Sequence, residues 1–330
     1  MTAQGRLRAA FCFPEQRLAS DCLASDNALL ITAADWQITT RKGMTMSQLL
    51  QDILRPQRLT EIVDIGANPI DGDPPYRQML RDGLCRVTGF EPQSDALAAL
   101  LACKSELERY LPHSIGDGGT HVLRICAGSG MTSLFEPDAA ALALFPELAP
   151  YAVVRERVPV ATRRLDDIAE ITQMDCLKID IQGGELDVFR HGREQLSRAV
   201  AIQTEVSFVT LYEGQPSFGE VDCELRSQGF IPHRFDAVKH WPIAPFAWPE
   251  QPRRALHQLL EADVVYIRDL ARPDLISSEQ YTHLALIAHN CYASHDLAMH
   301  CLAALERRHV LWSGAAEHYR QAVLNTVAAG

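Results

Sequence analysis

The sequence predicts an α/β fold whose core is a mostly parallel sheet of about seven strands. Two segments lead to this prediction, because in each an apolar strand runs into a glycine turn: residues 61–73 and residues 175–185. A further apolar run at 86–90 follows the first segment after a helical stretch at about 75–81. Strand, helix and strand in this order form a βαβ unit, in which the two strands are parallel.

Further strands are expected later in the chain. The diglycine turn at 183–184 leads into a helix on which Leu186 and Phe189 share one face. Strands are expected after it at 199–207, 229–235 and 263–268. Residues 236–256 are rich in Pro and Trp and are expected to form an irregular loop. Its aromatic rings either stack on a sugar ring or plug the edge of the sheet.

The two ends differ from the centre and divide the chain into three regions. Residues 1–55 are expected to form an extension, with a strand pair at about 28–32 and 36–40 and a helix at about 45–54. Residues 56–272 are expected to form the ligand-binding domain, and residues 273–330 a helical region.

Apolar residues at helical spacing form two stripes in this last region. The first stripe comprises Tyr281, Leu284, Ile287 and Ala288, and the second Leu297, Cys301, Leu302 and Leu305. One helical hairpin cannot bury both stripes, so we expect these helices to dock on the main domain or on a second subunit, which would give a homo-oligomer. Binding of a partner in the manner of helical repeats is the alternative.

Acidic residues surround the first glycine turn. Gly66 allows the backbone to approach a ligand closely, and Asp64, Asp71 and Asp73 lie around it. These carboxylates would repel a pyrophosphate and attract a sulfonium or ammonium group, by several kcal/mol per pair at roughly ε of 20. The G-x-G-x-x-G fingerprint of dinucleotide binding is also absent. The turn therefore favours S-adenosylmethionine over NAD.

Acids also stand at the carboxyl ends of the other strands, where open α/β sheets bind ligands. Glu91, followed by Pro92, is placed to accept hydrogen bonds from two ribose hydroxyls. Asp180 is expected to face the methyl group of the donor. Glu185 lies near a helix N-terminus, where its charge suits the helix dipole, and Glu205 is a candidate for the acceptor side.

Four motifs in order resemble the FkbM family of S-adenosylmethionine-dependent methyltransferases. They are V-D-I-G-A-N at 63–68, F-E-P at 90–92, R-L-D-D at 164–167 and K-I-D-I-Q-G-G-E at 178–185. The resemblance covers about residues 60–235. The chain departs from the family pattern at 69–72, where another glycine usually comes sooner, and at Gln182, where an acid is common. No role as a base is therefore assigned to position 182.

The resemblance implies a Rossmann-like class I methyltransferase sheet, with the N-terminal extension and the C-terminal helices as additions. It also implies an O-methyltransferase that acts on a hydroxyl, of a sugar or glycan. The donor would contact residues of the turns after the strands: Asp64, Gly66, Ala67, Asn68, Glu91, Pro92, Asp117 and Asp180. The candidate catalytic acids are Asp180, Glu185 and Glu205.

The segment 111–119 has two interpretations. It is similar to the third strand of the family with its acid, in which case Asp117 or the neighbouring amides meet the adenine. The alternative is a D-G hairpin turn, because 114–115 and 122–125 alternate like paired strands. Further on, residues 130–134 resemble the glycine and serine segment of the family near the donor.

Composition limits the other function classes. A formal charge of -11 disfavours a nonspecific nucleic-acid binder, and the basic pairs at 163–164 and 307–308 are short. Nine cysteines without a C-x-x-C pair predict neither a disulfide framework nor a cysteine zinc site, and the spacing of the C-terminal histidines does not predict a metal site. We find no span of 18 apolar residues and no signal peptide, and expect a cytoplasmic protein.

Two rival functions stay open at this point. An NAD-dependent oxidoreductase shares the fold class and the acid after the second strand. A noncatalytic methyltransferase-fold scaffold that binds a partner through its C-terminal helices is suggested by Gln182, which replaces an acid.

Overall fold

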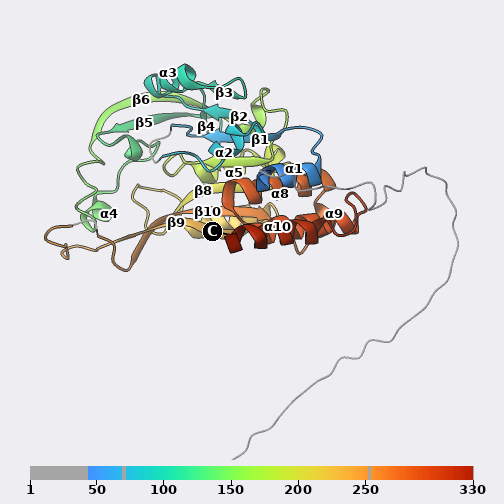
Figure 1. Cartoon of the computed structure of the whole chain (residues 1–330). Helices are drawn as coiled ribbons and strands as arrows, with labels where there is room; N and C mark the ends of the chain where they lie inside the picture. Colours follow the sequence, from blue (N-terminus) through green and yellow to red (C-terminus); the bar gives the residue numbers. More distant parts are fainter. Residues whose placement is uncertain (1–43, 69–71, 252–253, 330) are drawn as a thin grey trace, which may run out of the picture. The chain divides into compact units, whose positions relative to one another are not determined.

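A computed structural model describes residues 44–68, 72–251 and 254–329. The strand pair expected at 28–40 lies outside the described residues. The core is a seven-stranded sheet in the order β3-β2-β1-β7-β8-β10-β9 (Figure 1). Its strands are β1 (Thr60–Ile65), β2 (Cys85–Phe90), β3 (Glu108–Leu111), β7 (Cys176–Ile179), β8 (Ala201–Ser207), β9 (Phe230–Trp241) and β10 (Gln258–Arg268). The five neighbouring strands β3, β2, β1, β7 and β8 run parallel, while β10 pairs antiparallel with both β8 and β9. The prediction of a mostly parallel, Rossmann-like sheet is confirmed.

The sheet is covered on both faces by helices. On one face lie α1 (Met46–Leu54), α2 (Arg77–Arg81), α8 (Ser278–Tyr292), α9 (His295–Arg307) and α10 (Ala315–Ala329). The other face packs against α5 (Glu185–Arg190), α6 (Arg193–Leu196) and α7 (Phe218–Ser227). The helices α3 (Ser94–Cys103) and α4 (Ala139–Ala143) follow β2 and β5. The C-terminal helices therefore dock on the main sheet, which was one of the two sites expected for them.

Successive side chains in a strand point to opposite faces of the sheet, so a single strand can contribute apolar residues to the cores on both faces. Ile62 packs into the core with the C-terminal helices, whereas Val63 and Ile65 pack into the core with α5 and α7. The apolar stripes predicted on α8 and α9 are buried in the first of these cores. Helix α1 joins the same core through Leu49, Leu50, Ile53 and Leu54, after a capping box at Thr45.

A second, three-stranded sheet stands beside the first. It has the order β4-β6-β5 and comprises β4 (Ser114–Ile115), β5 (Thr120–Cys126) and β6 (Val154–Arg163). The hairpin expected between 114–115 and 122–125 is wrong, because β6 lies between these strands, parallel to β4 and antiparallel to β5. The strand β3 ends at Leu111, so the segment 111–119 contains only the last residue of this strand.

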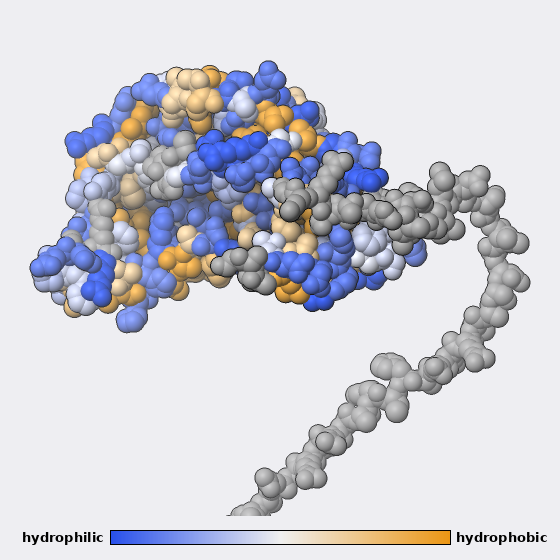
Figure 2. Space-filling model, in the orientation of Figure 1, coloured by the Kyte–Doolittle hydropathy of each residue, from blue (hydrophilic) through white to orange (hydrophobic). Residues whose placement is uncertain are grey.

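The loop expected at 236–256 is also wrong in its first part. Residues 236–241 continue β9, because β10 pairs with this strand as far as Trp241. Bulges interrupt the register at three places along this pair. Hydrophilic residues cover most of the face shown in Figure 2, and apolar residues appear there as small separate patches. Among the described helices, none combines the length and apolar character needed to cross a membrane.

Candidate active site

The turn after β1 brings three strand ends together. The N–H of Gly66 donates to the Phe90 carbonyl at 3.0 Å, and the N–H of Asp180 donates to the Ile65 carbonyl at 3.0 Å. Gly66 has φ +79, and a Cβ atom there would lie 2.0 Å from the carbonyl oxygen of Asp180. Only glycine allows this close approach, so Gly66 fixes the distance between the ends of β1 and β7.

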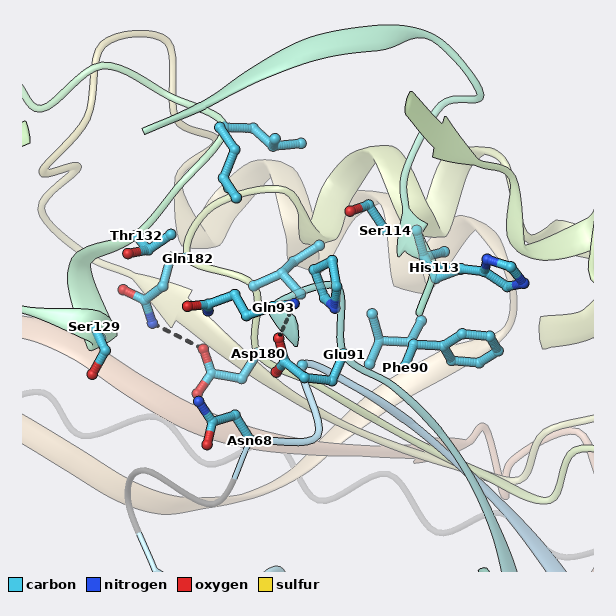
Figure 3. A pocket seen from close by; sticks show the side chains of 18 residues that line it. Asn68, Phe90, Glu91, Gln93, His113, Ser114, Ser129, Thr132, Asp180 and Gln182 are labelled. Carbon is cyan, nitrogen blue, oxygen red and sulfur yellow. Dashed lines mark hydrogen bonds between the residues drawn. The ribbon is translucent and has the colours of Figure 1, made fainter. Parts of the chain in front are cut away.

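A cavity opens at these strand ends (Figure 3). In Figure 3, Asn68, Asp180 and Gln182 lie towards one end of the cavity, with Glu91 between them and the pair Phe90 and His113 at the other end. Its walls come from the turns after β1, β2 and β7, from β4, and from the segment around η2 (Ser129–Met131). This is the carboxyl edge of the sheet, beside β1 and β7, where the order of connection reverses and such folds bind ligands.

Glu91 is held in the middle of this cavity. The residue is only 2% exposed, and its Oε1 accepts a hydrogen bond from the Gln93 N–H at 2.8 Å. Burial raises the pKa of the Glu91 carboxyl, while backbone hydrogen bonds from Gln93 and Asn68 act in the opposite direction. Beside it, the rings of Phe90 and His113 stack with centroids 6.4 Å apart. The middle of the cavity thus offers a carboxylate, and its end an aromatic wall.

Asp180 and Glu205 are linked by the amide of Gln182. The Gln182 Nε2 donates to Asp180 Oδ1 and to Glu205 Oε2, each at 2.9 Å. Gln182 has φ 58, and its carbonyl accepts from the Ser133 hydroxyl at 2.6 Å. An acid at position 182 would face two carboxylates, whereas the amide donates to both. The departure from the family pattern at this position therefore has a structural reason.

The other two candidate acids do not line the cavity. Glu205 is hydrogen-bonded to Gln182, and its pKa is raised well above the usual range by burial and by the charge of Asp180. Glu185 accepts hydrogen bonds from the N–H groups of Ile181 at 2.9 Å and Gly183 at 3.0 Å. Burial raises the pKa of Glu185 to about 7. Its contacts brace the turn that carries Asp180.

Several predicted donor contacts lie elsewhere. Gly66, Asn68, Glu91, Pro92 and Asp180 line the cavity together. Asp64 and Ala67 instead line a neighbouring cavity, on the face of the sheet that bears the C-terminal helices.

Asp64 is buried and already paired. Its Oδ1 lies 3.3 Å from Lys178 Nζ and its Oδ2 accepts from the Tyr76 hydroxyl. Asp73 is exposed and pairs with Arg77 and Arg81. Asp71 is outside the described residues. Of the acids expected to attract a cationic donor at the first turn, those described are thus neutralised by neighbours, and Asp180 is the carboxylate that meets the cavity.

Asp117 lies outside the cavity as well. Its Oδ1 is 2.7 Å from His121 Nε2 and accepts from the Gly119 N–H at 2.7 Å, so it closes the turn between β4 and β5. The hydrogen bond with His121 lowers the pKa of Asp117 to about 2. The wall at this end comes from His113, Ser114 and Ile115, which the sequence reasoning missed. They directly follow β3, and the end of a third parallel strand was the signal that would have found them.

The segment at 130–134, singled out by its resemblance to the family, does border the cavity through Gly130, Thr132 and Leu134. Gln93, Leu123 and Ser129 line it too and were not expected. Within the described residues, no group of three or more His, Cys, Asp and Glu side chains is arranged to hold a metal ion.

Fold and site together define a class I methyltransferase. The chain belongs to the FkbM methyltransferase family, because residues 64–232 match the methyltransferase FkbM domain. Over 162 residues it is 31% identical to the 2-O-methyltransferase NoeI of Sinorhizobium fredii (strain NBRC 101917 / NGR234). That match covers 47% of this chain and 66% of the relative, slightly less than two thirds of its length.

Solved structures similar to the chain include two methyltransferases. One is precorrin-6y C5,15-methyltransferase from Geobacter metallireducens GS-15, with 9% identity and a TM-score of 0.33, covering 67% of this chain and 87% of that one. The other is magnesium protoporphyrin IX methyltransferase from Synechocystis PCC 6803 with bound SAM, with 8% identity and a TM-score of 0.33, covering 68% and 79%.

Proposed function

We propose that this protein transfers a methyl group from S-adenosylmethionine to a hydroxyl group of a sugar or glycan. The observation that supports this most directly is the convergence of Gly66, Glu91 and Asp180 on one cavity at the carboxyl edge of the sheet. Family membership and a relative named as a 2-O-methyltransferase agree with it. The same membership disfavours an NAD-dependent oxidoreductase.

From one end of the cavity to the other, its residues suit the adenine, the ribose and the methionine part of the donor in turn. His113, which stacks on the fully buried Phe90, would offer its ring to the adenine, and Glu91 would accept hydrogen bonds from the ribose hydroxyls. Gly66 and Asn68 would leave room for the methionine part, close to Asp180. When bound, S-adenosylmethionine supplies an electrophilic methyl group on a sulfonium. The negative charge of Asp180 would favour that cation at its end of the cavity.

Asp180 is also placed to receive the proton of the acceptor hydroxyl. Its Oδ1 is occupied by the Gln182 amide, while its Oδ2 makes no hydrogen bond to any described residue. The Gln182 amide holds this carboxylate in position, and Glu205 anchors the same amide through a second hydrogen bond. Methyl transfer is an in-line displacement, and correct placement of the two reactants can contribute roughly 7 to 11 kcal/mol to the acceleration. Proton acceptance by a positioned carboxylate adds about 10²- to 10⁴-fold.

Isothermal titration with S-adenosylmethionine and S-adenosylhomocysteine tests the donor assignment. We expect both to bind the wild type, and Glu91→Ala to weaken binding by tenfold or more, since hydrogen bonds to a charged group contribute roughly 1.5 to 3 kcal/mol each. Glu108→Ala is the matched control. Glu108 is a similarly buried carboxylate, 9% exposed, that accepts from the Ser105 N–H and does not line the cavity.

Each other outcome has a defined meaning. Equal affinity of Glu91→Ala and wild type would refute the ribose assignment. Absence of heat with both ligands would refute the methyltransferase proposal and favour the scaffold, in which the C-terminal helices bind a partner.

A further inference from the structure

A second cavity lies next to the first, and the function proposed above does not use most of its residues. The two cavities share Asn68 and Asp180 in their walls. The second cavity lies on the face of the sheet that bears the C-terminal helices, and β9 contributes Asp236 to its wall. The residues that matter below are Asp64, Lys178, Asp180, Gln203, Asp236 and Asp263.

The strands change from apolar to polar where they reach this cavity. On the same face, Ile62, Cys176, Ala201 and Val265 are buried in the core with the C-terminal helices. Two positions nearer the carboxyl edge of the sheet, the same strands carry Asp64, Lys178, Gln203 and Asp263. Because side chains two apart in a strand share a face, these four residues form a polar layer on top of the apolar core.

Two members of this layer pair with each other, and two have no such partner. Asp64 pairs with Lys178, and Asp236 pairs with Arg234. Gln203 is 8% exposed, yet its Oε1 has no hydrogen-bond partner among the described residues. Within the described residues the side chain of Asp263 makes no hydrogen bond or close ion pair, although the charges of Lys178 and Lys239 act on it. A buried amide oxygen without a partner costs roughly 1 to 3 kcal/mol, and because Gln203 lines the cavity, a hydrogen-bond donor of a ligand there would relieve that cost.

The charge of the cavity restricts that ligand. Five carboxylates, of Asp64, Asp73, Asp180, Asp236 and Asp263, line it with the single ammonium of Lys178. Burial and the charge of Asp180 raise the pKa of Asp263, as expected where carboxylates crowd. Such a surface accepts hydrogen bonds from hydroxyl and ammonium groups and repels carboxylates, phosphates and sulfates.

We propose that this second cavity is the acceptor subsite, that Gln203 and Asp263 accept hydrogen bonds from hydroxyl or ammonium groups of the acceptor, and that the subsite selects neutral or amine-bearing sugars against acidic ones. The inference rests on the proposed methyl transfer for its purpose, because Asp180 is where the two cavities meet. The sugar-binding surface itself is defined by residues outside the donor cavity.

Three methyl glycosides and one sugar phosphate that differ mainly in charge serve as probes: methyl glucoside, methyl glucosaminide, methyl glucuronide and glucose 6-phosphate. Their binding is measured by saturation-transfer NMR with the free protein and with the protein saturated with S-adenosylhomocysteine. We expect the first two to bind and the two anions to bind at least tenfold more weakly. Gln203→Met keeps the size of the side chain and removes the acceptor oxygen. It should weaken the binding of the neutral and amino sugars by about tenfold without changing donor affinity.

Two charge variants distinguish selection against acidic sugars by the cavity from a general effect of the net charge of the protein. Asp263→Asn should reduce the difference in affinity between methyl glucuronide and methyl glucoside several-fold. Asp274→Asn, which makes the same charge change at an exposed position away from the cavity, should not.

The inference is overturned if the acidic sugars bind as well as the neutral ones, if none of the four sugars binds, or if Gln203→Met leaves sugar binding unchanged. It is also overturned if Gln203→Met weakens donor binding instead of sugar binding, since the cavity would then hold part of the donor. Failure of S-adenosylhomocysteine to bind would refute the proposed function, and the free protein would still report on sugar binding.

Discussion

Replacement of Gly66 by alanine tests how the site is assembled. The substitution adds one methyl group, whose carbon would lie 2.0 Å from the Asp180 carbonyl oxygen. Contacts of this kind are not observed below about 3.0 Å, so the end of β7 must move by about 1 Å. The movement breaks the bond from the Asp180 N–H to the Ile65 carbonyl, which contributes about 1 kcal/mol.

Gly83 provides the matched control. It has φ +71 against +79 for Gly66, and a Cβ atom there would meet nothing within 4 Å. Both alanine variants therefore carry the cost of a left-handed backbone, roughly 1 to 2 kcal/mol. Only Gly66→Ala adds the displacement of β7. We expect it to lose about 3 kcal/mol or more of unfolding free energy, and Gly83→Ala about 1 kcal/mol.

Urea denaturation measures the two losses, and titration with S-adenosylhomocysteine measures the state of the site. We expect Gly66→Ala to bind no ligand under conditions in which it is folded, and Gly83→Ala to bind as the wild type does. Equal losses of stability in the two variants, or normal binding by Gly66→Ala, would refute the argument that contact between the ends of β1 and β7 shapes the cavity.

Three further predictions concern the carboxylates of the site. Asp180→Asn should lower turnover by 10²-fold or more while the donor Kd changes only a few-fold; retention of turnover, measured as S-adenosylhomocysteine release, would remove Asp180 from the chemistry. Glu185 has a folded-state pKa of about 7 against an ordinary value of 4.5, so its contribution to stability is full below pH 4.5 and is lost as the pH rises through 7. The stability of wild type relative to Glu185→Gln should therefore fall by about 3 kcal/mol between pH 4.5 and 8 in urea titrations, and a constant difference would contradict the burial argument. Gln182→Glu places a third carboxylate against Asp180 and Glu205 and should lower the unfolding free energy at pH 8 by about 2 to 4 kcal/mol, whereas unchanged stability would show that the amide bridge is unimportant.

Local sequence patterns carried enough information for the sheet and for the turns after its first strands. The turn at Gly66, the acid at Glu91 and the turn before Glu185 each depend on a few consecutive residues, and each was predicted. The extent of β9 was not, because the pairing of 236–241 with β10 is a long-range contact that overrides the local signal of Pro and Trp.

The role of Asp64 shows a different limit. Strand alternation alone places Asp64 on the face opposite Val63 and Ile65, which is a statement about sequence. Whether that face bears the donor or another cavity depends on which helices cover it, and three of those helices, α8, α9 and α10, begin about 210 residues later or more, from Ser278 onwards. The same holds for Asp117, whose bond to Thr162 joins segments 45 residues apart. Contacts of this kind are invisible to short motifs.

Part of the wall of the second cavity lies beyond the boundary of the family domain. Gly66, Glu91, Asp180 and Gln203 lie inside residues 64–232, which the chain shares with its family, whereas Asp236 and Asp263 lie after them. Mutation of these two aspartates can therefore alter the charge of the second cavity without changing the residues that line the first. If that cavity receives the acceptor as proposed, exchange of the β9–β10 hairpin between two relatives should change the charge that they select while Gln203 stays in place.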